Sequence, residues 1–434
     1  MATKHPVGNS APTPGKPEVR TGRRSHILYI TSSSPIPAKI GPARRNYHIL
    51  QQLCRFYDVT HLCLGSRTEA ELFAHEFAER VPNHTFVHPR NGPRRKVAHK
   101  IWRTMTGRCD FAPVLEDGLH EACARLTATH SFDAIFLSCV LLRSLPLPMR
   151  TPVIGDTHNV EFDVHRQTAA NADGLARRAY AHWQWRSTRR AEQQCGQAVD
   201  LLLATSEHDR RVFEQELQLR DVGLVPNGID LREFIPASGG EVPGGILFTG
   251  LMSYYPNQQA VRWFLDAIFP AILRRHPAAK FVVGGAAAPA WLIARQSASV
   301  EVTGLVPDMR PHLTRASVVI APLRIGGGTR VKILEAAAMN RAVVSTSLGA
   351  QGLGLTHGKD ILIADDAEAF ADCVVRILED PAGAARMASA SREHVRLKFD
   401  WEYIGNDLAR LLDDRLQLVS DDAAKSLPTQ SRFA

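Results

Sequence analysis

Several features that would point directly to a function are missing from this chain of 434 residues. Its seven cysteines are scattered, odd in number and never spaced as C-x-x-C. This pattern disfavours a disulfide framework or a zinc site and favours a reducing compartment such as the cytosol. The chain also has no run of about 18 apolar residues, so no helix is expected to span a membrane.

The common nucleotide-binding signatures are absent as well. Neither half of the chain has G-x-G-x-x-G after its first predicted strand, which disfavours a nicotinamide or flavin dehydrogenase. The Walker loop G-x-x-x-x-G-K-[ST] does not occur. No Asp-x-Asp pair is present to hold a metal-bound diphosphate, because Asp365 and Asp366 are adjacent and lie late in the chain. We therefore expect no metal site and no bound cofactor.

Positive charge is in excess. The formal net charge is +8 and the pI is about 9.2, which favours anionic partners such as nucleotides, acidic lipid surfaces or nucleic acids. No helix-turn-helix, RNA-binding or zinc pattern accompanies the charge, so we expect no nucleic-acid partner. Pro89–Arg108 carries seven Lys or Arg and no acid, with Trp102 and Met105 interleaved. It fits either an anionic membrane surface that presents a lipid-linked acceptor or a solvated loop and helix face.

Short apolar runs alternate with helical patterns along the chain. In the first half the predicted strands are His26–Ser33, Asp58–Gly65, Thr85–Pro89, Asp133–Cys139, Pro152–His158 and Asp200–Ser206. In the second half they are Gly245–Gly250, Lys280–Gly285, Val300–Gly304, Val318–Leu323, Ala342–Thr346 and Ile361–Ala364. Such alternation predicts an α/β protein with two Rossmann-like, doubly wound domains. The two domains would face each other across a cleft at the carboxyl ends of their strands.

Composition divides the chain into segments. A stretch rich in glycine and proline over residues 230–245 marks the main break. We expect an N-terminal Rossmann-like domain over 25–230, a linker over 231–244 and a C-terminal Rossmann-like domain over 245–395. Residues 396–416 are predicted to form a helix that packs back on the first domain. Residues 1–24 are interpreted as a disordered arm, since they lack the apolar core of a secretory signal, and 417–434 as a disordered tail.

The most informative segment is Ser317–Gly349, which reads as strand, glycine turn, helix and strand. The turn, Gly326-Gly327-Gly328, lets the backbone approach a ligand closely and adopt positive φ. The helix begins directly after it, so unpaired N–H groups and the positive end of the helix dipole face the turn. This arrangement suits a phosphate or diphosphate, although many such turns carry glycines only for packing.

Four segments together resemble the retaining glycosyltransferases of family 4, whose two Rossmann-like domains form the GT-B arrangement. The segments are GGGTRVKILEAAAMNRAVVSTSLGAQGL, VPNGID, LLATSEHD and GDTHN. The resemblance extends from about Ser25 to Asp414. It is strongest to bacterial transferases that build exopolysaccharide or other surface glycans. Their GGGxRxKxLEA and Gxxxxx-P-N patterns are matched by Gly326–Ala336 and Gly250–Asn257.

The resemblance assigns the donor site to the glycine turn and its helix. Glu335 matches the second glutamate of the family's E-x7-E motif, which holds the ribose of the donor nucleotide. The first glutamate would fall at Gly327, so the motif is degenerate, and backbone amides of Gly327–Thr329 are expected to replace it. Arg330 and Lys332 are the nearest cations for the diphosphate. The donor-binding residues are thus expected to be Gly41, Gly326, Gly327, Gly328, Thr329 and Glu335.

Two of the implied site residues lie in the first domain. His158, at the end of a predicted strand, matches a histidine near the transferred sugar in relatives, although a histidine at a strand end is usually just a satisfied polar residue. Gly41, in the loop after the first strand, matches a flexible loop near the donor phosphates. By contrast, Ser206 and Asp209 fit the start of a helix, where they would act as a cap. The catalytic set expected from the resemblance is His158, Arg330, Lys332 and Glu335.

The resemblance implies a metal-independent, retaining hexosyltransferase. Its donor would be a nucleotide-diphosphate sugar, bound on the side of the C-terminal domain. Its acceptor would be a glycan or lipid-linked acceptor, on the side of the N-terminal domain. We expect it in the cytoplasm, with a peripheral position on the inner face of the cell membrane as one option. A nucleotide-sugar epimerase on the same fold is an alternative, although acid and base carboxylates for it are not evident. Because Gly327 stands in place of a glutamate, a catalytically inactive nucleotide-sugar-binding protein is another.

Overall fold

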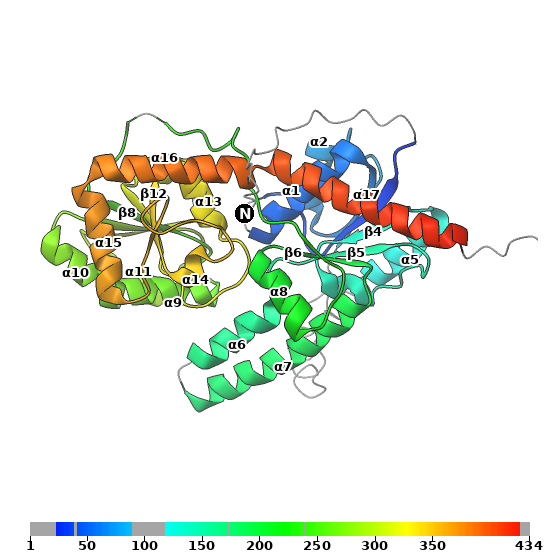
Figure 1. Cartoon of the computed structure of the whole chain (residues 1–434), viewed down its shortest axis with the longest axis horizontal. Coiled ribbons are helices and arrows are strands. Elements are labelled where there is room, and N and C mark those ends of the chain that lie inside the picture. Colours follow the sequence, from blue (N-terminus) through cyan, green and yellow to red (C-terminus); the bar gives the residue numbers. More distant parts are fainter. Residues whose placement is uncertain (1–22, 39–40, 89–117, 172–173, 238, 426–434) are drawn as a thin grey trace, which may run out of the picture.

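The computed structural model describes residues 23–38, 41–88, 118–171, 174–237 and 239–425. The basic stretch Pro89–Arg108, nearly all of the predicted arm and the end of the predicted tail lie outside these residues. Figure 1 shows two α/β units side by side, each a sheet flanked by helices, with a long C-terminal helix crossing to the first unit. The predicted α/β class with two doubly wound sheets is confirmed.

The first sheet has seven parallel strands in the order β3-β2-β1-β4-β5-β6-β7. The strands are β1 (His26–Thr31), β2 (Asp58–Leu64), β3 (His84–Val87), β4 (Ala134–Leu137), β5 (Val153–Asp156), β6 (Leu201–Ala204) and β7 (Val222–Leu224). All six strands expected for this half are present. The seventh, β7, was not predicted, because a three-residue edge strand with a central glycine leaves almost no apolar pattern.

Helices cover both faces of the first sheet. They are α1 (Gly41–Phe56), α2 (Arg67–Phe77), α5 (Leu119–Thr129), α6 (Glu161–Asn171), α7 (Leu175–Gln197) and α8 (Glu207–Glu216), with a 3-10 helix over Val140–Ser144. The predicted cap of α8 is confirmed, since the Oγ of Ser206 accepts a hydrogen bond from the backbone N–H of Asp209 at 3.0 Å. Gly41 was expected in a loop but is the first residue of α1.

The second sheet has six parallel strands in the order β10-β9-β8-β11-β12-β13. The strands are β8 (Gly245–Thr249), β9 (Lys280–Gly284), β10 (Val300–Gly304), β11 (Val318–Ala321), β12 (Ala342–Ser345) and β13 (Leu362–Ile363), so each predicted strand of this half is present. The helices are α9 (Tyr255–Trp263), α10 (Phe269–Arg275), α11 (Ala290–Ile293), α12 (Arg310–Arg315), α13 (Val331–Ala338), α14 (Ser347–Ala350), α15 (Ala367–Glu379) and α16 (Pro381–Lys398). A π-helical turn over Phe264–Ile268 joins α9 to α10.

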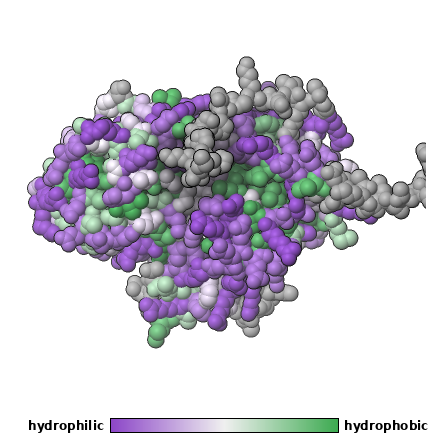
Figure 2. Space-filling view, in the orientation of Figure 1, coloured by the Kyte–Doolittle hydropathy of each residue, from purple (hydrophilic) through white to green (hydrophobic). Residues whose placement is uncertain are grey.

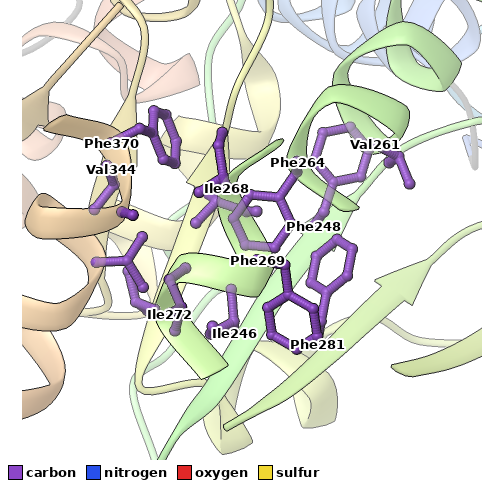
Figure 3. Close-up of a cluster of buried hydrophobic side chains, with 14 of the residues drawn as sticks. Ile246, Phe248, Val261, Phe264, Ile268, Phe269, Ile272, Phe281, Val344 and Phe370 are labelled. Atoms are coloured by element: carbon purple, nitrogen blue, oxygen red, sulfur yellow. The ribbon is translucent and has the colours of Figure 1, made fainter. Parts of the chain in front are cut away.

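An aromatic core holds the second unit together (Figure 3). The ring of Phe264 lies 4.5 Å from that of Phe281 and 5.7 Å from that of Phe269, centroid to centroid, and all three side chains are buried. Phe248, on β8, belongs to the same cluster and is fully buried. The core therefore fixes the carboxyl end of β8, which borders the candidate site.

The C-terminal helix, α17 (Trp401–Lys425), returns to the first unit. The ring of Trp401 stacks on His48 of α1 at 4.9 Å, and the hydroxyl of Tyr57 donates to the backbone oxygen of Ala409 at 3.0 Å. The helix continues to Lys425, past the boundary expected at residue 416, because its helical pattern runs on without a break. In the part of the chain that the structure describes, no helix is long and apolar enough to cross a bilayer.

Candidate active site between the two sheets

The glycine turn after β11 is pressed against the loop that follows β5 in the first unit. A Cβ built on Gly328 would lie 2.5 Å from the backbone oxygen of His158, and Gly328 has a φ of +70°. A Cβ on Gly327 would lie 3.3 Å from the Cβ of Asn159. Glycine is therefore required at Gly328 on both steric and conformational grounds. The structure thus brings the backbone of His158 and the glycine turn together.

Hydrogen bonds hold this turn in place across the cleft. The backbone N–H of Gly326 donates to Oε1 of Gln167 in α6 at 2.8 Å. The hydroxyl of Thr329 donates to the backbone oxygen of Thr205 at 2.7 Å and accepts from the backbone N–H of Asn227 at 3.3 Å. Thr329 therefore links the turn to Thr205, directly after β6, and to Asn227, shortly after β7.

Three backbone amides of the turn are unpaired. Among the described residues, the backbone N–H groups of Gly327, Gly328 and Thr329 form no hydrogen bond, and Gly328 and Thr329 are buried. α13 begins two residues beyond Thr329, and no side chain caps its N-terminus. Free amides and the start of a helix form a binding place for an anion.

Arg330 is the most buried cation of the site, with 7% of its surface exposed. Its guanidinium donates to the backbone oxygens of Gly327 and Gly328 and so turns those carbonyl groups towards itself. Its Nε has no hydrogen-bond partner. Burial lowers the pKa of Arg330. Arg330 is therefore a buried cation with one N–H left unpaired within the protein.

Lys332 is the second residue of α13. Its Nζ donates to Oδ1 of Asn257 at 3.0 Å and sits 3.8 Å from the centroid of the Phe248 ring. Burial, and then the nearby charge of Arg330, lower the pKa of Lys332 to about 7. A buried ammonium with one hydrogen bond and one aromatic face gains most from an added anion.

We expect the binding of a nucleoside diphosphate to weaken as pH rises above about 7, because Lys332 then loses its charge in the free protein. The anion favours the ammonium, so binding takes up a proton, and Kd increases by at most about tenfold per pH unit. The free energy of unfolding should instead rise with pH between about 7 and 10.5. In this range Lys332 is protonated in the unfolded chain but mostly neutral in the folded one. Calorimetric titration across this range measures the first effect.

The matched control for this titration is Lys332→Met, which keeps the volume of the side chain and removes the proton. It should bind nucleoside diphosphate more weakly and show a much flatter dependence of Kd on pH. A wild-type Kd that does not change with pH would contradict the place assigned to Lys332 beside the diphosphate.

Glu335 forms an ion pair with Arg44 of α1, across the cleft. The side chain of Glu335 is 12% exposed and that of Arg44 is 27% exposed. The guanidinium of Arg44 also lies over the ring of Phe234, 5.6 Å from its centroid. Glu335 is thus mostly buried, and it has a partner from the first unit that the sequence did not reveal.

The two first-unit residues of the predicted site differ in their surroundings. Burial lowers the pKa of His158 to about 4, so its imidazole is neutral near pH 7. Gly41 is exposed, and a Cβ built on it would contact nothing within 4 Å. His158 therefore borders the glycine turn, whereas the structure gives no contact between Gly41 and the other site residues.

Sequence reasoning missed several residues at this cleft. Tyr254 is close enough to charges of both units to feel them. Burial and then Glu161 raise its pKa to about 12, while Arg330 opposes the shift. Burial also raises the pKa of Glu161, the first residue of α6. Asn257 holds Lys332 and sits in the P-N pair of the recognised pattern, so that motif was the available signal. Arg44, Glu161 and Tyr254 left no such signal.

The acidic pair Asp365-Asp366 has structural contacts instead. Asp365 accepts hydrogen bonds from the backbone N–H and the hydroxyl of Ser347, and Asp366 caps α15 through the backbone N–H of Ala369 at 2.8 Å. The described residues form no cluster of three or more His, Cys, Asp or Glu side chains that could hold a metal ion.

Known structures share this architecture over most of the chain. The sucrose-phosphate synthase of Thermosynechococcus elongatus superimposes with a TM-score of 0.67 at 16% identity, over 90% of this chain and 99% of the other. The Anabaena protein Alr3699/HepE, in complex with UDP and glucose, gives 0.64 at 13% identity, over 90% and 100%. The fold is GT-B. The two sheets of this GT-B chain thus meet at the cleft where the glycine turn lies.

Sequence comparison agrees with the GT-B fold. Residues 243–380, which include the glycine turn and α13, match the family model described as glycosyl transferases group 1. A relative from Corynebacterium glutamicum, GDP-mannose-dependent monoacylated alpha-(1-6)-phosphatidylinositol monomannoside mannosyltransferase, is 24% identical over 52% of this chain and 65% of its own length. Matches to curated relatives span between 42% and 65% of the length of those proteins. The family match therefore covers the second unit of the GT-B fold, which carries the glycine turn.

Proposed function

We propose that this chain is a retaining glycosyltransferase that moves a sugar from a nucleotide-diphosphate sugar to a glycan or lipid-linked acceptor. The observation that carries the proposal is a set of polar groups gathered where the two units meet. The free amides of the glycine turn, the unpaired Nε of buried Arg330, the Lys332 ammonium and the Glu335 carboxylate all lie on one turn and the helix after it. These groups match the parts of a nucleotide-diphosphate sugar: diphosphate and ribose.

The charges of the site suit the breaking of a bond to a diphosphate. In the proposed reaction the anomeric carbon–oxygen bond to the phosphate breaks, and negative charge grows on the phosphate oxygens. The amides of the turn, the N-terminus of α13, Arg330 and Lys332 would stabilise that charge. No metal ion is needed for this role when fixed cations and amides already surround the phosphates, so we propose a metal-independent reaction.

The acceptor side lies towards the first unit. In the proposed step the released phosphate oxygen takes the proton of the acceptor hydroxyl, and the acceptor oxygen bonds to the anomeric carbon from the same face. The configuration at the anomeric carbon is then retained. Neutral His158, which borders the glycine turn, could hydrogen-bond a sugar hydroxyl without adding positive charge beside the forming oxocarbenium ion. Glu335 would bind the ribose hydroxyls once Arg44 is released.

Two findings support a role in surface-glycan synthesis. One curated relative is a lipopolysaccharide core biosynthesis mannosyltransferase from Rhizobium leguminosarum. Another is an uncharacterised protein in the cps region of Klebsiella pneumoniae. We therefore propose an exopolysaccharide or surface-glycan pathway in the cytoplasm. We leave the donor base to experiment, because one relative is GDP-mannose-dependent whereas a structural neighbour was solved with UDP-glucose.

The test is release of nucleoside diphosphate from a panel of UDP-, GDP-, ADP- and dTDP-sugars. Each donor is incubated with and without bacterial lipid extract, and with EDTA or added Mg²⁺. We expect release from one donor, stimulated by the lipid extract and unchanged by EDTA. Product analysis by NMR then checks that the anomeric configuration of the donor is kept.

Other outcomes separate the alternatives. Tight binding of one donor with no release under any condition would favour the inactive nucleotide-sugar-binding protein, consistent with Gly327 in place of a glutamate. Conversion of one donor into its epimer without acceptor would favour the epimerase. Release abolished by EDTA and restored by Mg²⁺ would contradict metal independence.

A further inference from the structure

Helices α6 and α7 form a hairpin that projects from the first unit (Figure 1). α6 begins at Glu161, directly after the loop that touches the glycine turn. The buried carboxylate of Glu192, in α7, accepts hydrogen bonds from the backbone N–H groups of Glu161 at 3.1 Å and Phe162 at 2.9 Å. Arg166 braces the hairpin against α8 through Glu216 at 2.8 Å. The base of the hairpin is therefore rigidly tied to the rim of the cleft.

One face of α7 carries a basic stripe, defined here as Arg178, His182, Arg186 and Arg190. These four residues follow strict i, i+4 spacing, and each is exposed to solvent. Residues at this spacing lie on one side of a helix, so the stripe runs along roughly 18 Å of α7. No acidic residue occurs between residues 174 and 191. The stripe therefore presents positive charge without an intervening carboxylate on its own helix.

Near the free end of the hairpin, α7 exposes apolar and aromatic side chains. The side chain of Leu175 is 85% exposed, and that of Tyr180 is 41% exposed. The ring of Tyr180 stacks on that of Trp183 at 5.9 Å, with 25° between the ring planes. Figure 2 shows hydrophobic surface at the tip of this projection, next to hydrophilic surface along its length. An exposed leucine beside stacked aromatic rings is costly in water unless another surface covers it.

We propose that the α6–α7 hairpin docks on an anionic lipid bilayer. The basic stripe would lie along the phosphate headgroups, while Leu175 and the Tyr180–Trp183 pair enter the boundary between headgroups and acyl chains. A nucleic acid would satisfy the stripe but would leave Leu175 in water. The combination of a basic face and an apolar aromatic tip therefore fits lipid better.

The position of the hairpin gives docking a consequence for the cleft. Because α6 starts beside His158 and the glycine turn, docking of the hairpin would bring the acceptor side of the cleft towards the lipid surface. A lipid-linked acceptor could then enter without leaving its bilayer. Docking itself does not depend on the transferase reaction, whereas this link to the acceptor rests on the proposed function.

The test is co-sedimentation of the full chain with vesicles of phosphatidylcholine alone or with about one third phosphatidylglycerol. The double variant Arg186→Glu, Arg190→Glu is compared with a control of equal charge change, Arg274→Glu, Arg386→Glu. These control arginines are exposed on α10 and α16 of the second unit, away from the hairpin in Figure 1. A third variant, Leu175→Ser, tests the apolar tip.

We expect wild type and control to sediment with the phosphatidylglycerol vesicles and not with neutral ones, and less so in high salt. The hairpin charge reversal should lower partition by about thirtyfold or more, since each basic side chain at such a surface contributes roughly a fivefold gain. Leu175→Ser should weaken partition while the salt dependence is kept. Transfer to a water-soluble acceptor should be unchanged in all variants, which separates a failure of docking from a failure of the proposed reaction.

Three results would overturn the proposal. The first is equal sedimentation with neutral and anionic vesicles. The second is anionic-vesicle binding that the hairpin reversal leaves intact, which would move the membrane surface to another part of the chain. The third is loss of binding to a nucleic-acid probe in the hairpin variant with no vesicle binding in wild type, which would make the stripe a nucleic-acid surface.

Discussion

Replacing Arg330 by alanine is expected to lower kcat/KM roughly 30- to 1,000-fold. This corresponds to a loss of about 2–4 kcal/mol of transition-state stabilisation, by analogy with the loss of a single oxyanion donor. Arg330 is almost fully buried, holds the carbonyl groups of the glycine turn and keeps one N–H unpaired. Its loss removes positive charge where the diphosphate would leave. Glu335→Ala is expected to cause a loss of similar size through the ribose. Steady-state release of nucleoside diphosphate measures both variants.

The control for this pair is Arg324→Ala. Arg324 is exposed, lies just before the glycine turn and rests over the ring of Trp263 at 5.3 Å. It should keep nearly wild-type kcat/KM. Arg330→Lys keeps the charge but loses the planar guanidinium, whose Nη1 donates to both carbonyl groups, so it should fall between wild type and alanine. Full activity in both Arg330→Ala and Glu335→Ala would show that the donor does not bind at this turn.

Breaking the buried ion pair between Arg45 and Asp156 is expected to cost about 3–5 kcal/mol of the free energy of unfolding. Arg45, on α1, donates to both carboxylate oxygens of Asp156 at 2.8 and 2.6 Å, and both side chains are at most 1% exposed. It also donates to the backbone oxygen of Val225 at 2.9 Å and to Oδ1 of Asn227 at 3.0 Å. Arg45→Met would leave the Asp156 charge buried without a partner. Urea unfolding measures the loss.

A double-mutant cycle separates this effect from simple loss of packing. Arg45→Met combined with Asp156→Leu removes both charges and should recover part of the stability lost in either single variant. Arg55→Met, on the same helix but partly exposed, should change the free energy of unfolding by less than about 1 kcal/mol. Equal losses for Arg45→Met and Arg55→Met would contradict the importance assigned to the buried pair.

Most of the fold could be predicted from the sequence because buried parallel strands are written as continuous apolar runs. All twelve expected strands occur, as with Val318–Leu323, which contains β11. β7 escaped because three residues with a central glycine carry no pattern, and its pairing with β6 supplies what local sequence does not. The length of α17 was underestimated for the opposite reason, since a regular pattern was stopped too early.

The candidate site divides along the same line. The glycine turn, Lys332 and Glu335 are close in sequence, so their spacing alone places them on one turn and one helix. Arg44 and Glu161 come from the first unit, and they approach Glu335 and Tyr254 only after both units have folded and met. Sequence patterns record neighbours along the chain, whereas these contacts depend on the relative position of two sheets.

The ion pair between Arg44 and Glu335 sets up a competition inside the protein. In the proposed donor complex, the ribose and Arg44 of the first unit would compete for the same carboxylate. A donor that captures Glu335 must therefore cut one of the ties between the two halves of the molecule. Donor binding and separation of the two units would therefore be thermodynamically coupled. The two units would be held together more tightly in the protein without donor.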